Sequence, residues 1–241
     1  MHACGHDGHT AMALGAAKYL SETKNFNGTV YFIFQPDEEK TQGAQAMIDY
    51  GLFEIFSIDE VYAFHNLPGM EVGSFATRSG TITASESLFN IKLWGQGGHS
   101  ALPHMGVDTI TVGTQIITSL QSIVSRKLNP AMNGVVSVTK FESDGNENIL
   151  PGHSIISGDA RALSPEANKI IEDSMRNIVE GIANAHGIKF EFTYDTRTNM
   201  TINTTDQAAF ASKVAEDLVG TDNVDGNCDP KLFSEDFAQM L

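Results

Sequence analysis

The first ten residues of the chain, MHACGHDGHT, hold side chains that are suited to metal chemistry. Cys4 and His6 are two positions apart, so an extended backbone directs both side chains to the same side. Thiolate and imidazole groups are good ligands for zinc and similar divalent metals, and His9 adds a further imidazole nearby. The pattern therefore indicates a metal site. Two other interpretations stay open: Cys4 as a nucleophile assisted by His6, and a polar surface loop with a stray cysteine.

Two adjacent carboxylates, Glu38 and Glu39, follow the apolar run TVYFIFQ at 29–35. Neighbouring residues in an extended backbone face opposite directions, so one carboxylate can bind a metal while the other faces the water that the metal activates. Hydrolysis needs this division, because the metal lowers the pKa of water and a carboxylate that is not a ligand takes the proton. A Glu-Glu pair alone is usually exposed charge, so its meaning depends on its neighbours.

Further polar residues stand where a strand or a loop would present them to a site. His65 follows the apolar run EVYAF at 60–64, and it is a candidate ligand or a structural histidine. His99 lies in GGHSALPH, where two glycines suit a substrate-facing loop, although an ordinary turn is the simpler interpretation. Arg161 could bind a substrate carboxylate through its fork of donors or pair with one of the acidic residues, and Asn148 is a similar case.

The elements that must position these residues follow from the apolar runs. The runs at 29–35 and 60–64 predict two buried parallel strands, with a helix at 43–50 between them. Each strand ends in polar residues, an order that is typical of an α/β sheet with a site at its carboxyl edge. A further helix is expected to follow the first polar cluster, with Thr10 as its N-cap.

The pattern from 86 to 197 predicts a second, inserted domain. Its expected elements are a strand near 88–93, a helix at 107–126, strands at 134–141 and 153–162, a helix at 166–186 and a strand at 188–194. This β-α-β-β-α-β order is that of the ferredoxin-like unit. The predicted fold class is therefore α/β: a catalytic domain with a parallel-type sheet, formed by 1–85 and 198–241 and interrupted by the inserted domain (86–197).

Composition excludes several classes of protein. The chain has 241 residues, of which 41% are hydrophobic and 19% charged, which is an ordinary globular balance. A net charge of −15 with scattered Lys and Arg residues disfavours binding to nucleic acid. No continuous apolar stretch reaches the roughly 18 residues of a membrane span, and a signal-peptide pattern is missing from the first ten residues. With only two cysteines, Cys4 and Cys228, the chain is expected to be cytoplasmic.

Several motifs together resemble a known family. They are MHACGHDGHTAMALGAA, FIFQPDEE, FHNLPG, GQGGHSALPHMGVD, NILP and SEDF. The same motifs recur in this order in the co-catalytic metallopeptidases that include aminoacylases and glutamate carboxypeptidases. The most similar branch is the amidohydrolases, with hippurate hydrolases, N-acyl-amino-acid amidohydrolases and plant auxin-conjugate hydrolases. The resemblance covers nearly the whole chain, and HACGHDGHT combined with QPxEE is highly specific.

The resemblance implies roles for the candidate metal residues. Cys4 matches a ligand that bridges two metal ions, and His6, Glu39 and His65 match further ligands. Glu38 matches the general acid/base. The intact enzyme would hold two divalent ions per subunit (Zn, Mn, Co or Ni) and no organic cofactor.

The resemblance also implies roles for residues of the inserted domain. This domain matches the lid and dimerisation domain of the family, so a homodimer is expected. His99 matches a histidine that enters the partner subunit's site and polarises the scissile carbonyl, and Asn148 and Arg161 match positions for substrate recognition. The implied reaction is hydrolysis of the amide of a small N-acyl amino acid by a metal-activated water, with no nucleic-acid or membrane partner.

The chain departs from the family pattern in three respects. Family members begin well before the HACGHD motif, they continue past SEDF to a final histidine ligand, and they usually carry Ala where this chain has Asp37. We therefore expect an internal fragment with an incomplete catalytic domain, which binds at most one divalent ion and hydrolyses N-acyl amino acids barely above background. The alternative function is a dimerising or binding scaffold without turnover.

Overall fold

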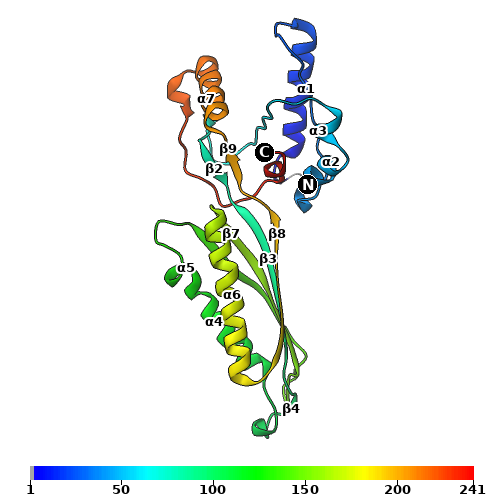
Figure 1. The fold of residues 1–241 in the computed structure, drawn as a ribbon, viewed down its shortest axis with the longest axis vertical. Coiled ribbons are helices and arrows are strands. Elements are labelled where there is room, and N and C mark those ends of the chain that lie inside the picture. Colours follow the sequence, from blue (N-terminus) through cyan, green and yellow to red (C-terminus); the bar gives the residue numbers. More distant parts are fainter. Residues whose placement is uncertain (1–2) are drawn as a thin grey trace.

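The computed structural model describes residues 3–241 and has an elongated, mixed α/β fold (Figure 1). The helices are α1 (His6–Thr23), α2 (Gly43–Asp49), α3 (Leu52–Ile55), α4 (Thr109–Leu120), α5 (Ser122–Arg126), α6 (Pro165–His186) and α7 (Thr205–Val219). The strands are β1 (Phe75–Ala76), β2 (Gly80–Thr83), β3 (Ser85–Trp94), β4 (Gly98–His99), β5 (Gly134–Ser143), β6 (Ile149–Leu150), β7 (His153–Ala162), β8 (Lys189–Thr198), β9 (Thr201–Asn203) and β10 (Val224–Asp225). Short 3₁₀ turns are η1 (Glu38–Lys40), η2 (Pro103–Met105), η3 (Thr221–Asn223) and η4 (Asp236–Met240).

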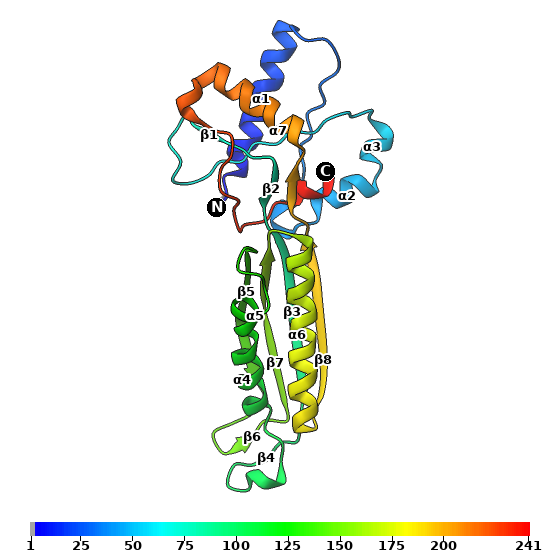
Figure 2. The same ribbon diagram turned by 60° about the vertical axis from the view of Figure 1, so that its left-hand side comes forward.

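A long sheet dominates one end of the molecule. Its four antiparallel strands have the order β5-β7-β3-β8. Helices α4 and α6 lie on one face of this sheet, as Figure 2 shows. Along β7 buried and half-buried residues alternate, which is the pattern of a strand with one covered face. The chain order from β3 to β8 is that of a split βαβ unit.

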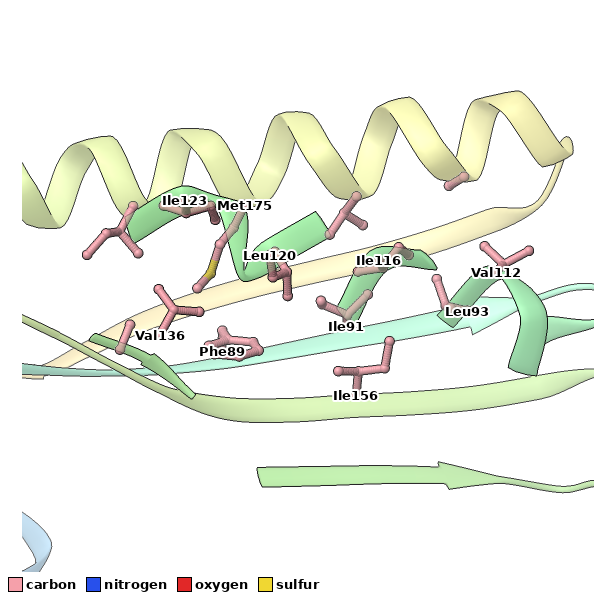
Figure 3. Close-up of a cluster of buried hydrophobic side chains, with 14 of the residues drawn as sticks. Phe89, Ile91, Leu93, Val112, Ile116, Leu120, Ile123, Val136, Ile156 and Met175 are labelled. Atoms are coloured by element: carbon pink, nitrogen blue, oxygen red, sulfur yellow. The ribbon is translucent and has the colours of Figure 1, made fainter. Parts of the chain in front are cut away.

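The main hydrophobic core lies between this sheet and helices α4 and α6 (Figure 3). Its buried side chains recur at every second position in β3 and at every fourth position in α6. They include Phe89, Ile91 and Leu93 of β3 and Ile171, Met175 and Val179 of α6. Helices α4 and α6 also begin at favourable N-caps. The Asp108 carboxylate accepts from the Ile110 amide at 2.9 Å, and the Ser164 hydroxyl accepts from the Ala167 amide at 3.1 Å.

The two predicted parallel strands at 29–35 and 60–64 are wrong. Both segments lie outside every strand of the structure, and no strand among the described residues pairs with either of them. Val30 and Phe34 are each 46% exposed, and Phe64 is 67% exposed. An apolar run forms a buried strand only when neighbouring strands satisfy its backbone groups and cover its side chains. Between residues 3 and 241, parallel pairing is limited to β1 with β10 and an isolated bridge between Thr83 and Lys231.

The opposite end of the molecule is held together more loosely. A small second cluster packs Ala44 and Leu52 against Met240, with Ile33 and Phe237 beside them. Helix α1 begins at His6 with Gly5 as its N-cap, not at the predicted Thr10, and none of its residues is buried. Between residues 3 and 241, none of the helices combines the length and the apolar character needed to cross a membrane.

Candidate metal centre

Three ligand-type side chains meet where α1 begins. One ligand atom each from Cys4, His6 and His65 lies within 4.8 Å of the others. Gly5 has a φ of 80°, and a Cβ atom there would lie 2.4 Å from the Asn66 side-chain oxygen, so glycine is required between the two ligand candidates. The backbone is helical from His6 and not extended as predicted, because the left-handed Gly5 starts α1.

His65 is oriented by its second ring nitrogen. Its Nδ1 donates to the Asn66 carbonyl oxygen at 2.7 Å, which leaves Nε2 facing the Cys4 Sγ at 3.5 Å and the Glu235 Oε2 at 3.9 Å. Burial lowers the pKa of His65, so the neutral form that can bind a metal is favoured. His9 supports this arrangement, because its Nε2 contacts Asn66, at 2.6 Å from the side-chain oxygen and at 3.1 Å from the backbone nitrogen.

The two neighbouring carboxylates face different nitrogens of His6. The Glu38 Oε2 lies 3.4 Å from His6 Nε2, and the Glu39 Oε1 lies 3.6 Å from His6 Nδ1. The side chain of Glu38 is 19% exposed, whereas that of Glu39 is 72% exposed. The extended backbone predicted here is wrong: the pair lies in η1, between Asp37 and Thr41, which have φ values of 53° and 56°. The tight turn still separates the two carboxylates.

Glu235 is a site residue that was not predicted. One carboxylate oxygen each from Glu38, Glu235 and Asp236 lies within 4.8 Å of the others. Burial is the largest cause that raises the pKa of both Glu38 and Glu235 to about 7, and the negative charge of Glu235 adds to the effect on Glu38. The SEDF motif that contains Glu235 was recognised in the sequence as part of the family resemblance, but no chemical role was assigned to its residues.

The residues gathered here fit a divalent cation. Burial, followed by the negative charges of Glu39, Glu38 and Glu235, raises the pKa of the Cys4 thiol. This surplus of negative charge disfavours the free thiolate that a cysteine nucleophile needs, and a bound cation would offset it. His6 Nε2 is also buried without a hydrogen-bond partner among residues 3–241. The donor set of thiol, imidazoles and carboxylates suits zinc and its neighbours.

Two other predicted site residues lie far from this cluster. His99 is in β4 and pairs with Ile149 of β6, and the Asn148 carbonyl oxygen accepts from the Ser100 amide at 3.0 Å. His99 and Asn148 are therefore near each other, at the end of the molecule opposite the N-terminus (Figure 2). Within one chain the structure does not bring them to the metal ligands.

Arg161 lies at the junction between the long sheet and the metal end. Its guanidinium donates to Glu86 at 2.6 Å, to Asp159 at 2.8 Å and to the Ser234 hydroxyl at 3.1 Å. These contacts show Arg161 paired with acidic residues of its own chain. Its contact with a substrate carboxylate stays a prediction.

Alignments with two relatives extend over most of this chain. The chain is 41% identical over 237 residues to a hippurate hydrolase of Campylobacter jejuni, covering 98% of this chain and 62% of the relative. It is 40% identical over 197 residues to an N-acyl-L-amino acid amidohydrolase of Geobacillus stearothermophilus, covering 81% of this chain and 53% of the relative. The chain therefore spans about 62% or less of the length of these two proteins.

Solved structures agree with the sequence relatives. A putative aminohydrolase from methicillin-resistant Staphylococcus aureus has a TM-score of 0.90 and 33% identity, with 100% of this chain and 62% of that chain covered. A dinuclear metal binding peptidase of the M20 family from Bacillus subtilis has a TM-score of 0.82 and 30% identity, with 100% and 60% covered. The family described as peptidase family M20/M25/M40 matches residues 1–241. This chain belongs to peptidase family M20/M25/M40.

Proposed function

We propose that the chain is the core of an amidohydrolase that cleaves the amide bond of N-acyl amino acids, with two divalent ions per subunit in the whole enzyme. The observation that carries this proposal is the cluster in which Cys4, His6 and His65 meet beside Glu38 and Glu39. The names of the hippurate hydrolase and of the N-acyl-L-amino acid amidohydrolase support the substrate class. We assign Cys4, His6, Glu39 and His65 to metal binding.

Glu38 has the surroundings of a general acid/base. Bound divalent ions would supply Lewis-acid activation of the water and of the scissile carbonyl. Glu38 is shielded from solvent, and burial raises its pKa to about 7 in the metal-free chain, which suits a carboxylate that takes a proton from water and returns it to the leaving amine. The more exposed Glu39 remains free to act as a ligand.

The inserted domain is assigned to dimerisation in this proposal. His99 and Asn148 lie at the far end of the chain from the metal cluster, so they can act on a substrate there only if a second subunit supplies them. A twofold homodimer would provide such residues to both sites at once. We assign His99 to polarising the carbonyl and Asn148 and Arg161 to substrate recognition.

Metal loading combined with turnover tests the proposed function. The 241-residue chain is loaded with Zn²⁺ or Mn²⁺, its ion content is determined by native mass spectrometry, and hydrolysis of N-benzoylglycine and N-acetyl amino acids is followed. We expect at most one bound ion per chain and turnover barely above background, and we expect Cys4→Ser and His65→Ala to reduce the ion content. A chain that binds no ion contradicts the proposal. Turnover that resists a chelator but is abolished by thiol alkylation would indicate a cysteine hydrolase.

A further inference from the structure

Asp236 carries a fully buried carboxylate. It is 0% exposed, and it lies at the start of η4, next to Glu235. Its Oδ2 accepts from the Ala44 backbone amide at 3.0 Å, and its Oδ1 accepts from the Gln35 side-chain amide. A buried carboxylate persists only with such partners, because its desolvation is otherwise very costly.

The two hydrogen-bond donors, Gln35 and Ala44, lie on either side of the turn that carries Glu38 and Glu39. Gln35 precedes and Ala44 follows the segment 37–41, so Asp236 joins the two ends of the turn. Positive φ values at Asp37 and Thr41 make this turn unfavourable on its own, since residues other than glycine rarely adopt them. Strained turns of this kind persist when the surrounding structure determines them from outside.

The segment that holds Asp236 is itself fixed to the long sheet. Arg161 of β7 donates to the Ser234 hydroxyl at 3.1 Å, and the Ala84 amide donates to the Phe233 carbonyl oxygen at 3.0 Å. On the other side, Phe237 packs into the second hydrophobic cluster. Asp236 therefore holds the turn from a well-anchored position.

We propose that Asp236 is a positioning residue that fixes the 37–41 turn, so that Glu38 and Glu39 both face His6. The proposal rests on the proposed function, since it concerns the base and the ligand assigned there. Its physical basis is the pair of hydrogen bonds from Gln35 and Ala44 to one buried carboxylate. No direct contact of Asp236 with substrate or metal is required.

A donor–acceptor exchange tests this role. In Gln35→Glu a second carboxylate opposes Asp236, so neither side chain donates and this hydrogen bond is lost. The double variant Gln35→Glu/Asp236→Asn lets the new amide donate to the new carboxylate, at unchanged net charge. The introduced asparagine would still accept from the Ala44 amide through its remaining oxygen. Local damage that is unrelated to this hydrogen-bond pair would not be repaired in this way.

Two readouts are measured on each chain. Calorimetric titration with Zn²⁺ gives the metal affinity, and hydrogen–deuterium exchange of a peptide spanning 36–47 reports on the turn without any metal. We expect Gln35→Glu to weaken Zn²⁺ binding by about 10–100-fold, as loss of a supporting partner of a ligand does, and to speed exchange in this peptide. The double variant should recover both. If Gln35→Glu does not fold, Gln35→Ala is measured instead and should act in the same direction.

A matched control separates positioning from general loss of stability. Ile116→Val removes one methyl group from the main core, far from the turn, and should leave Zn²⁺ affinity and the 36–47 exchange unchanged. The proposal is overturned if Gln35→Glu changes neither readout, or if the double variant recovers neither. If the unmodified chain binds no Zn²⁺, the proposed function fails, and the exchange measurement alone then decides whether Asp236 positions the turn.

Discussion

Glu38 and Glu39 are neighbours in sequence, but they differ in exposure and in the His6 nitrogen that each faces. We predict that in the full-length enzyme Glu38→Gln lowers turnover by about 10²–10⁴-fold while the metal content stays the same, because a base is lost and no ligand is removed. Glu39→Gln should instead lower the affinity for the metal. Elemental analysis of the purified chains, together with N-benzoylglycine hydrolysis, checks both. Equal metal loss in the two variants would refute this division.

A second prediction at the residue scale concerns pH. The pKa of both Glu38 and Glu235 is raised from 4.5 to about 7 in the folded, metal-free chain. The folded state therefore binds more protons than the unfolded state in this window, and its free energy of unfolding falls as the pH rises from below 4.5 to above 7. Urea unfolding in the presence of a chelator should show this fall, and Glu38→Gln/Glu235→Gln should make it shallower. Parallel pH profiles for the two chains would contradict the assignment.

The residues of the candidate metal centre whose types and motifs are distinctive could be predicted from the sequence. Cys4, His6 and His65 needed only their chemical type and the motif resemblance to be singled out, and the structure brings them together. Glu235 and Asp236 were not assigned, because their importance comes from burial and from partners far away in the chain. The hydrogen bond from Gln35 to Asp236, for example, joins residues 201 positions apart. Such contacts leave no local pattern in the sequence.

At the scale of elements, alternation was a better guide than apolar character. The alternating residues of β3, β7 and β8 reflect a sheet with one covered face, and the predicted strands agree with the observed ones within a few residues. The continuous run at 29–35 indicated only that the segment is suited to burial. Whether strands lie on both sides of it is a property of the rest of the fold, and within the described residues none does.

Two glycines at the end of the molecule that holds the candidate metal centre offer a matched test of local packing. At Gly43, where α2 begins, a Cβ atom would lie 1.5 Å from the Pro36 carbonyl oxygen, whereas at Gly15 in α1 it would meet nothing within 4 Å. We predict that Gly43→Ala destabilises the chain by about 1–3 kcal/mol or more through overpacking. Gly15→Ala should stabilise it by up to about 1 kcal/mol through helix propensity. Denaturant unfolding measures both, and an equal gain in the two variants would show that Pro36 does not approach Gly43 as described.

At the scale of the whole molecule, the chemistry is divided between two distant ends. The metal cluster lies beside the N-terminus, and His99 and Asn148 lie beyond the far end of the long sheet (Figure 2). Arg161 and Ser234 connect that sheet to the segment of Glu235 and Asp236. If His99 and Asn148 act on the substrate as proposed, a second chain must bring them to the metal cluster.

A complementation experiment tests that arrangement. If His99 acts in the site of the partner subunit, a heterodimer of Glu38→Gln and His99→Ala chains contains one site with an intact Glu38 and an intact His99. Random pairing of equal amounts then restores roughly one quarter of the sites, although each variant alone is inactive. Turnover is measured with variants of the full-length enzyme after they are mixed under conditions that exchange subunits, and the association state is determined by sedimentation. Mixing Glu38→Gln with Cys4→Ser is the control, because both changes lie in the same end of the chain and each site keeps one of them. A monomer in sedimentation, or a mixture no more active than its components, would show that His99 does not serve a partner.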